Sequence, residues 1–431
     1  MDVFQSGSLI NTLSGKSISI VKLIDGTGAC CLYLVDIDGE RAVLKWYRPH
    51  GTGRNPKELY ETLRHKMEIG PPGQEFIWPL DVTEWIDESF GYIIRQFPDG
   101  YYDLTDFMMQ KARFACFRTK IDAAMNIVSS FRSLHNIGFS FQDLTDESIY
   151  INPETGRVLI PDDDSLVLHS VNTGILGTPR YMAPEIVMGK KMPDMLSDRY
   201  SMSIILFLLF CMTHPLEGKR YLAAWLTPAL QEKIYNSEAL FIMDQNDQSN
   251  APDPRIQKYT IAIWAALPEY VRSLFQKAFS QEAIHNPKCR VSELEWIDTL
   301  IHFRCDIVDC ECGNEVFMQN AVNCKCDKCG KYVSVPFRLE LENYSVPCAK
   351  GARLYRCQFG VCLSDESLSP MGMIVANRDA SALGIRNLSN NSWDAITSKG
   401  ETREVPPKSV IPLKDGIRFT AGTQSVIIRA N

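Results

Sequence analysis

Apolar and polar positions alternate along the first part of the chain, as they do in half-buried strands. One stretch breaks this alternation, because Leu59, Leu63 and Met67 recur at the four-residue spacing of a helix that follows Pro56 and stops at Gly70. We therefore expect a hairpin-rich antiparallel sheet interrupted by one helix. The strand-like stretches are residues 16–48, 77–82 and 90–96.

The apolar spacing turns helical near residue 104 and stays helical to about residue 303, apart from a strand-like segment at residues 149–166. The longest apolar run, residues 203–212, is about half as long as a membrane-spanning helix needs to be. We expect it to form a buried helix. A cysteine cluster and a turn-rich, strand-rich tail follow, so the predicted fold class is α+β.

Composition narrows the function classes only slightly. The 431 residues suffice for two or three domains at roughly 100–200 residues each. With 45 basic and 52 acidic residues the net charge is −7, which argues against general binding of nucleic acids or anionic membranes. The first residues lack the basic and apolar regions of a secretory signal, so a cytoplasmic location is expected.

Two closely spaced cysteine pairs indicate a metal site. Cys310 and Cys312 form a C-x-C pair, and Cys326 and Cys329 form a C-x-x-C pair, each followed directly by glycine. Such pairs can present four sulfurs tetrahedrally to zinc. Cys324 and Cys305 are nearby in sequence; Cys324 could replace Cys326, whereas Cys305 is expected outside the site. A closed four-cysteine site predicts a structural zinc ribbon without catalytic chemistry.

The sequence Gly-Thr-Pro-Arg-Tyr-Met-Ala-Pro-Glu at residues 177–185 resembles the end of a protein-kinase activation segment. Two more residues match that family. Asp198 stands at the start of the buried helix, where kinases use an aspartate to hold the catalytic-loop backbone. Arg290 stands where kinases place the arginine that pairs with the last residue of this segment, here Glu185.

Phosphoryl transfer needs a phosphate cradle and a lysine in the strand-rich lobe. Gly26 and Gly28 fit the first two glycines of the kinase phosphate loop, and Lys45 in Ala-Val-Leu-Lys fits the lysine that contacts the ATP phosphates. The family resemblance also requires a helical glutamate for that lysine. We expect a Lys45–Glu61 ion pair, with Glu58 as the alternative.

The remaining catalytic positions depart from the kinase pattern. Asp143 in Phe-Gln-Asp-Leu aligns with the catalytic aspartate, which orients the substrate hydroxyl or accepts its proton. Ser148 replaces the asparagine that binds a second magnesium ion. Three aspartates follow the strand at residues 158–160, and Asp162 or Asp164 is the expected magnesium ligand, because adjacent carboxylates repel one another unless a cation lies among them.

Residues 14–303 resemble a eukaryotic-like protein kinase domain, with an N-lobe at about 14–96 and a C-lobe at about 97–303. A zinc ribbon is expected at 304–335, and residues 336–431 weakly resemble a forkhead-associated β-sandwich. The Phe-Gln-Asp-Leu loop, the acidic triplet and the ribbon resemble a bacterial kinase subgroup of tellurite-resistance-like stress systems. That resemblance implies two partners, a von Willebrand A-type protein and a metal-dependent phosphatase.

The sequence thus predicts a serine/threonine protein kinase that uses ATP and Mg²⁺ and carries structural Zn²⁺, acting on a protein substrate in a bacterial stress or signalling system. The alternative is a pseudokinase that binds nucleotide and acts as a scaffold through its ribbon and tail. A zinc-ribbon protein that binds nucleic acid is the third hypothesis, and the acidic balance argues against it.

Overall fold

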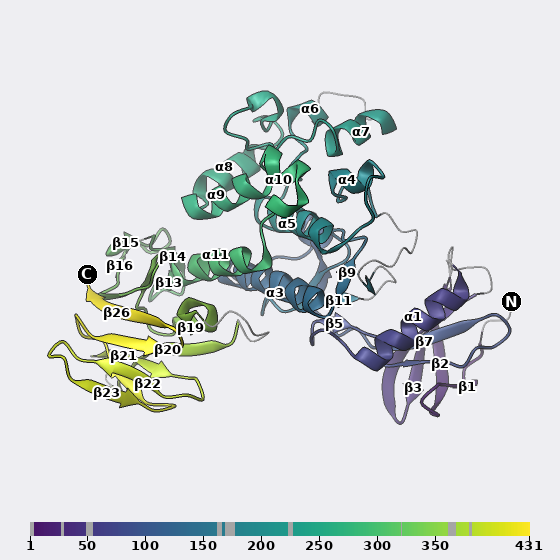
Figure 1. The fold of residues 1–431 in the computed structure, drawn as a ribbon, viewed down its shortest axis with the longest axis horizontal. Helices are drawn as coiled ribbons and strands as arrows, with labels where there is room; N and C mark the ends of the chain where they lie inside the picture. The colour runs from purple at the N-terminus through teal and green to yellow at the C-terminus, as the bar shows by residue number, and fades with distance from the viewer. Residues whose placement is uncertain are drawn as a thin grey trace.

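The computed structural model describes residues 4–26, 30–48, 55–161, 166–168, 177–222, 227–319, 321–360, 368–378 and 382–431. Three parts follow one another along the long axis of the molecule (Figure 1). A strand-rich N-lobe lies at one end, a helical C-lobe in the middle, and a β-rich C-terminal region at the other end. The fold is α+β, as the sequence predicts.

The N-lobe is built on a six-stranded antiparallel sheet in the order β1-β2-β3-β4-β7-β6. The predicted alternation is clear in β3, where Cys31, Tyr33 and Val35 are buried and their neighbours are only partly buried. These strands are β1 (Leu9–Asn11), β2 (Ser17–Asp25), β3 (Cys30–Ile37), β4 (Glu40–Tyr47), β6 (Asp81–Val82) and β7 (Phe90–Arg95).

One helix, α1 (Pro56–Ile69), interrupts this sheet where the sequence predicts it. The side chain of Asn55 accepts a hydrogen bond from a first-turn backbone N–H, and proline at the first helical position needs no N–H partner. Gly70 ends the helix with a φ of 78°, which a glycine adopts without steric cost. The side chains that α1 buries are those of Leu59, Leu63 and Lys66.

The C-lobe surrounds a buried helix, α5 (Met195–Cys211), in which every residue from position 200 to 211 is buried. Asp194 starts this helix by accepting backbone N–H groups of its first turn, and Ser197 completes a capping box. The prediction of a buried helix for the longest apolar run is therefore confirmed.

Further helices and short strands complete the C-lobe. The helices are α2 (Leu104–Met108), α3 (Phe117–Asn136), α4 (Pro184–Val187), α6 (Lys219–Leu222), α7 (Pro228–Tyr235), α8 (Lys258–Ala266), α9 (Glu269–Ala278), α10 (Gln281–His285) and α11 (Glu293–Cys305). The strands are β5 (Phe76–Ile77), β8 (Tyr102–Asp103), β9 (Phe139–Phe141), β10 (Tyr150–Ile151), β11 (Val158–Pro161) and β12 (Leu166–Leu168).

Two small hairpins follow α11 and hold the cysteine pairs: β13 (Ile307–Asp309) with β14 (Glu315–Phe317), and β15 (Asn323–Lys325) with β16 (Tyr332–Ser334). Glu315 accepts hydrogen bonds from the backbone N–H groups of Phe117 (2.7 Å) and Arg118 (3.2 Å), and so caps α3. The residue before this helix, Cys116, makes no side-chain cap of its own. These hairpins are thus attached to the C-lobe through the start of α3.

The C-terminal region consists of a six-stranded sheet in the order β18-β17-β26-β25-β22-β23 and a four-stranded sheet in the order β19-β20-β21-β24. Trp393 connects the two sheets, since a Cβ added at Gly372 would lie 3.0 Å from the indole Cη2. The strands are β17 (Phe337–Glu340), β18 (Ser345–Pro347), β19 (Arg353–Tyr355), β20 (Pro370–Ala376), β21 (Leu383–Asn387), β22 (Trp393–Ile396), β23 (Thr402–Val405), β24 (Val410–Pro412), β25 (Arg418–Ala421) and β26 (Gln424–Ala430).

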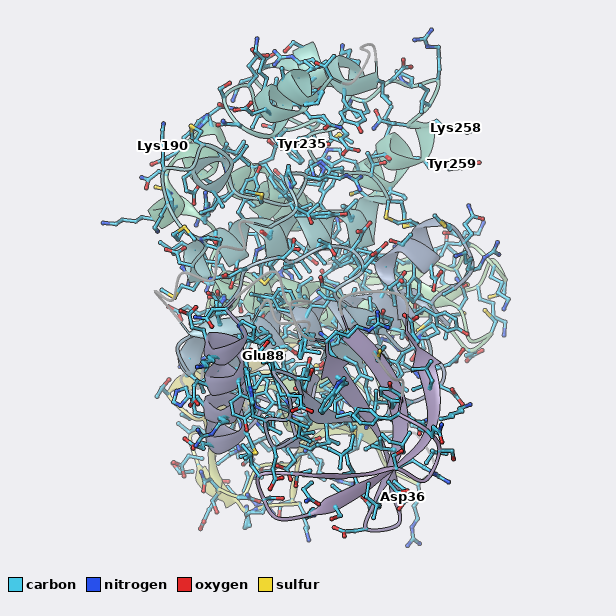
Figure 2. The ribbon with its side chains drawn as sticks, turned by 90° about the vertical axis from the view of Figure 1, so that its right-hand side faces the viewer. Asp36, Glu88, Lys190, Tyr235, Lys258 and Tyr259 are labelled. Carbon is cyan, nitrogen blue, oxygen red and sulfur yellow. The ribbon has the colours of Figure 1, made fainter. Side chains whose placement is uncertain are left out.

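Figure 2 views the molecule from the N-lobe end, with Asp36 at the lower edge of the N-lobe sheet and Lys190, Tyr235 and Lys258 in the helical lobe above. Among the helices in the part of the chain that the structure describes, none has both the length and the apolarity needed to cross a membrane.

Candidate functional site

The segment from β9 to β10 contains the predicted catalytic aspartate. Asp143 is partly buried, and its Oδ1 accepts two hydrogen bonds from Thr178: one from the backbone N–H at 2.7 Å and one from the hydroxyl at 2.9 Å. Thr178 belongs to the segment at residues 177–185. The structure therefore brings the loop of Asp143 and this segment together, with one carboxylate oxygen of Asp143 fixed in place.

The side chain of Ser148 is buried inside the same loop. Its Oγ accepts a hydrogen bond from the Thr145 backbone N–H at 3.0 Å and donates one to the Asp143 carbonyl oxygen at 3.3 Å. In this arrangement the hydroxyl closes the loop on itself. Its role as a metal ligand remains a prediction.

Asp198 supports the loop from below. One carboxylate oxygen accepts a hydrogen bond from the Phe141 backbone N–H at 2.7 Å and contacts His135 Nε2 at 3.0 Å. This is the backbone-holding role expected for Asp198. His135 was not among the predicted site residues, because nothing in its sequence context shows that α3 and α5 meet there.

His135 connects Asp198 to Glu293, whose Oε1 lies 2.9 Å from Nδ1 of the imidazole. Burial alone would lower the pKa of His135, but hydrogen bonds to the two carboxylates raise it to about 9. Burial alone would raise the pKa of Glu293, but hydrogen bonds from His135 and Arg199 lower it to about 2. The imidazole is therefore a cation at neutral pH and joins α3, α5 and α11.

The predicted pair between Arg290 and Glu185 is formed. The guanidinium donates bidentately to the carboxylate at 2.8 and 2.7 Å, and the arginine side chain is only 2% exposed. A further hydrogen bond to the Leu196 carbonyl oxygen at 2.8 Å ties the pair to α5. The segment ending at Glu185 is thus fixed to the C-lobe core.

Lys45 lies on β4, between Leu32 of β3 and Tyr92 of β7. Its Nζ is 5.4 Å from the ring centre of Tyr47 and 5.7 Å from that of Tyr92, which is within cation–π range. Gly26 ends the β2 side of the neighbouring hairpin, and its carbonyl oxygen accepts a hydrogen bond from Arg48 at 2.6 Å.

Glu61 does not lie where the predicted ion pair requires it. It is two positions from Leu59, roughly 200° around α1, and therefore on the face opposite the buried one. Its side chain is 65% exposed and is bound by Arg64 at 3.1 Å. Glu58, the alternative, is also exposed. The buried face of α1 instead presents Lys66, 1% exposed, with Nζ 5.7 Å from the Trp78 ring centre.

Three of the predicted residues lie outside the described residues: Gly28, Asp162 and Asp164. The last described residue before the two aspartates is Pro161, which ends β11. The assignment of the magnesium ligand between Asp162 and Asp164 therefore stays open.

The four predicted zinc ligands come together. The sulfurs of Cys310, Cys312, Cys326 and Cys329 all lie within 4.8 Å of one another, and two of the Sγ–Sγ distances are 3.5 and 3.7 Å. Tetrahedral zinc with Zn–S bonds of about 2.3 Å places its sulfurs roughly 3.8 Å apart, so this geometry fits zinc. Cys324 lies on β15 and is not part of the cluster, and neither is Cys305.

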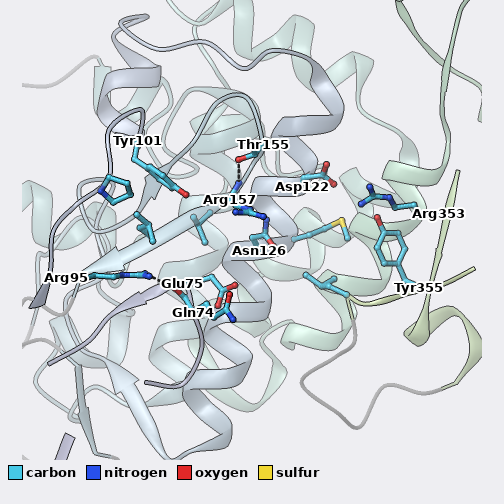
Figure 3. Close-up of a pocket in the computed structure, with 15 residues that line it drawn as sticks. Gln74, Glu75, Arg95, Tyr101, Asp122, Asn126, Thr155, Arg157, Arg353 and Tyr355 are labelled. Atoms are coloured by element: carbon cyan, nitrogen blue, oxygen red, sulfur yellow. Dashed lines mark hydrogen bonds between the residues drawn. The ribbon is translucent and has the colours of Figure 1, made fainter. Parts of the chain in front are cut away.

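A separate cavity of about 530 Å³ lies where the helical lobe meets the C-terminal region and the end of β7 of the N-lobe (Figure 3). Arg95, Arg157 and Arg353 line it together with Glu75 and Asp122. Asp122 is already bound by Arg304 of α11. This polar cavity contains none of the predicted catalytic residues, so we assign it to the junction between these parts.

Comparison with known proteins agrees with this geometry. The sequence model described as "Protein kinase domain" matches residues 84–286, less than half of the chain. A probable serine/threonine-protein kinase of Saccharomyces cerevisiae is 29% identical over 128 residues, which cover 29% of this chain and 8% of the yeast protein. A protein kinase C delta type homolog of Drosophila melanogaster is 28% identical over 135 residues, covering 30% of this chain and 20% of the fly protein.

The chain therefore contains a protein kinase domain, the class of domain that catalyses ATP-dependent phosphoryl transfer. It spans well under a quarter of either of these relatives, and both are distant. The region expected to be the N-lobe begins earlier than the matched residues, and its extent remains a prediction.

Proposed function

We propose that this protein is a serine/threonine protein kinase that transfers the γ-phosphate of ATP to a protein hydroxyl. The observation that carries the proposal is the pair of hydrogen bonds from Thr178 to Asp143. They leave the second carboxylate oxygen of Asp143 available to orient a substrate hydroxyl or to accept its proton. Thr178 thereby sets the direction of the carboxylate.

The other predicted residues would hold the nucleotide and its metal. Lys45, Gly26 and Gly28 would contact the phosphates of ATP, which supplies the transferred group when bound. Asp162 or Asp164, with Ser148, would hold Mg²⁺. The acidic triplet is what supports this choice, since three consecutive carboxylates favour a cation among them.

The second candidate function is a pseudokinase that binds nucleotide without transferring phosphate. Two observations favour it: the hydroxyl of Ser148 is engaged within its own loop, and Glu61 of α1 is exposed and bound by Arg64. Both observations concern groups predicted to position nucleotide and metal rather than the loop that holds Asp143.

Transfer of radiolabel from γ-labelled ATP decides between these functions, with Asp143→Asn as the variant and Glu147→Gln as a matched control. Glu147 is an exposed residue of the same loop. A kinase should lose activity about 100-fold or more in Asp143→Asn, in the range of a lost general base, and keep it in the control. Wild-type protein that binds ATP but transfers no label would establish the pseudokinase.

For the four-cysteine cluster we propose a structural zinc ion, with all four positions of the ion taken by sulfur. Metal analysis of the purified chain should give one zinc per molecule and a loss of that zinc in Cys326→Ser. Cys324→Ser is the matched control, because Cys324 lies two residues away and outside the cluster. Zinc retained in Cys326→Ser and lost in Cys324→Ser would assign the ligand set differently.

We also propose a biological setting for this kinase. The resemblance to the bacterial subgroup supports a role in a tellurite-resistance-like stress system, with a von Willebrand A-type protein and a metal-dependent phosphatase as partners. The two facing sheets of the C-terminal region are compatible with a forkhead-associated-like sandwich. Dephosphorylation of the kinase product by that phosphatase, tested with purified proteins, would support the pairing, and a product that resists it would contradict the pairing.

A further inference from the structure

A second cavity, of about 370 Å³, opens on the C-lobe between α2, the start of α3 and the end of α5. Its volume falls within the range of about 300–1,000 Å³ that is typical of small-molecule sites. It contains none of the residues assigned above to ATP, magnesium or zinc. The lining residues are Phe107, Gln110, Ala112, Arg113, Phe114, Cys116, Phe117, Lys120, Leu209 and Met212.

The walls of this cavity are mainly apolar and aromatic. The rings of Phe107 and Phe114 stack with their centres 4.4 Å apart, and Phe117 keeps 40% of its surface exposed. Leu209 and Met212 close the inner side, where α5 ends. Exposed aromatic surface beside a cavity is unfavourable in water, so an apolar ligand would be stabilised by covering it.

The charged residues in the lining are all basic. Lys120 and Arg113 are the two ionisable nitrogen bases, and no acidic residue is among the lining residues. Lys120 Nζ lies 6.0 Å from the Phe114 ring centre. Burial lowers the pKa of Lys120 to about 8, because it disfavours the charged ammonium group, and Cys211 acts in the opposite direction.

We propose that this cavity binds a small amphiphilic carboxylate, with the apolar chain against the phenylalanines and the carboxylate on Lys120. An apolar pocket with a few convergent polar groups is the usual composition of a small-molecule site. A carboxylate would supply the missing counter-charge and so offset the cost of burying the ammonium group. The proposal does not depend on the kinase activity.

Dodecanoate below its micelle concentration is the probe, and titration calorimetry on the full chain is the measurement. Saturable binding of one molecule per chain is expected, weakened at least tenfold in Lys120→Met. Lys111→Met is the matched control, because Lys111 is 63% exposed, lies outside the lining and is paired with Asp106. Dodecanol should bind at least tenfold more weakly than dodecanoate and should not respond to Lys120→Met.

Ala112→Leu provides an independent variant, since it fills part of the cavity without changing the charge. It should weaken dodecanoate binding while leaving Lys120 in place. Acylation of lysines followed by mass spectrometry gives a second readout: dodecanoate should protect Lys120 and leave the labelling of Lys111 unchanged.

Three results would overturn the proposal. The first is the absence of saturable binding, and the second is equal binding by wild type, Lys120→Met and Ala112→Leu. The third is protection of Lys120 by an acidic amphipathic peptide but not by dodecanoate, which would assign the cavity to a protein partner instead.

Discussion

The two glutamates that sequence reasoning assigned to ion pairs have different surroundings in the structure. Glu185, at the end of the activation-like segment, is bound bidentately by the buried Arg290. Glu61, on α1 of the N-lobe, points to solvent and is bound by Arg64. The C-lobe pair thus follows the kinase pattern, whereas the N-lobe pair does not.

The sequence fixes the positions of the two glutamates to different degrees. Glu185 belongs to nine consecutive residues that match in order, so its position is fixed by its neighbours. The prediction for Glu61 rests on the family resemblance, which requires a glutamate on this helix but does not fix the helix face that it occupies. Leu59 and Leu63 already define the buried face, and Glu61 lies opposite to it.

The protein follows the kinase pattern at some positions and departs from it at others. The contacts that hold the catalytic loop and the activation-like segment from below are present, including those of Asp198 and Arg290. The departures among the described residues are at Ser148, whose hydroxyl is engaged within its own loop, and at Glu61 of α1. The described contacts around Asp143 therefore follow the kinase pattern.

Breaking the C-lobe pair should have the largest effect on stability. Arg290→Ala leaves the largely buried Glu185 carboxylate, which is 13% exposed, without its partner and should lower the free energy of unfolding by about 3–5 kcal/mol, measured by urea denaturation. Arg255→Ala serves as a control, because Arg255 is 87% exposed and pairs with the nearby Asp253. Equal effects of the two variants would contradict the special role of the buried pair.

The network of His135 should make C-lobe stability depend on pH. The pKa of His135 is raised from 6.5 to about 9, so its charge stabilises the folded state fully below about pH 6.5, and this contribution is lost as the pH rises through 9. The destabilisation caused by His135→Gln should therefore shrink by roughly 1–3 kcal/mol between pH 6 and pH 9.5. A penalty that is the same at both pH values would show that folding does not raise the pKa of His135.

Measurements of phosphoryl transfer test the predicted Lys45–Glu61 pair of the N-lobe. Lys45→Ala should reduce phosphoryl transfer about 100-fold, as expected when a transition-state charge contact is removed, whereas Glu61→Ala should change it less than about threefold. The measurement is the initial rate at saturating ATP. A loss in Glu61→Ala as large as that in Lys45→Ala would support the ion pair predicted from the sequence.

The smallest of these effects concerns the cap that the β13–β14 hairpin provides for α3. Glu315→Ala removes acceptors for two first-turn N–H groups and should cost about 1 kcal/mol of stability, visible as a lower midpoint in urea. Glu311→Ala is the control in the same hairpin, because Glu311 is 84% exposed and pairs with Lys331. If the cap contributes nothing to stability, both variants will unfold at the same urea concentration as the wild type.

Much of the fold could be predicted from the sequence, because its elements carry strong local signals. The bounds of α1 follow from Pro56, the spacing of its leucines and Gly70. The cysteine cluster follows from pair spacing, and it excludes Cys324 because that side chain lies on a strand of the hairpin rather than at its turn.

The remainder depended on long-range packing that no local pattern encodes. Glu293 is 158 residues away from His135, and neither residue lies in a motif that predicts the contact. Thr178 could have been found, since it lies inside the segment already identified at residues 177–185. The cavity at Lys120 arises where three separate elements meet, so only the structure reveals it.

The cap on α3 has a consequence for the order in which the chain matures. The acceptor for Phe117 is a residue 198 positions further along, so it leaves the ribosome long after the helix that it caps. At about 5–20 residues per second the interval is roughly 10–40 s. During synthesis the start of α3 therefore stays open to water or to a chaperone, and this helix obtains its cap only after the two cysteine-bearing hairpins have been made.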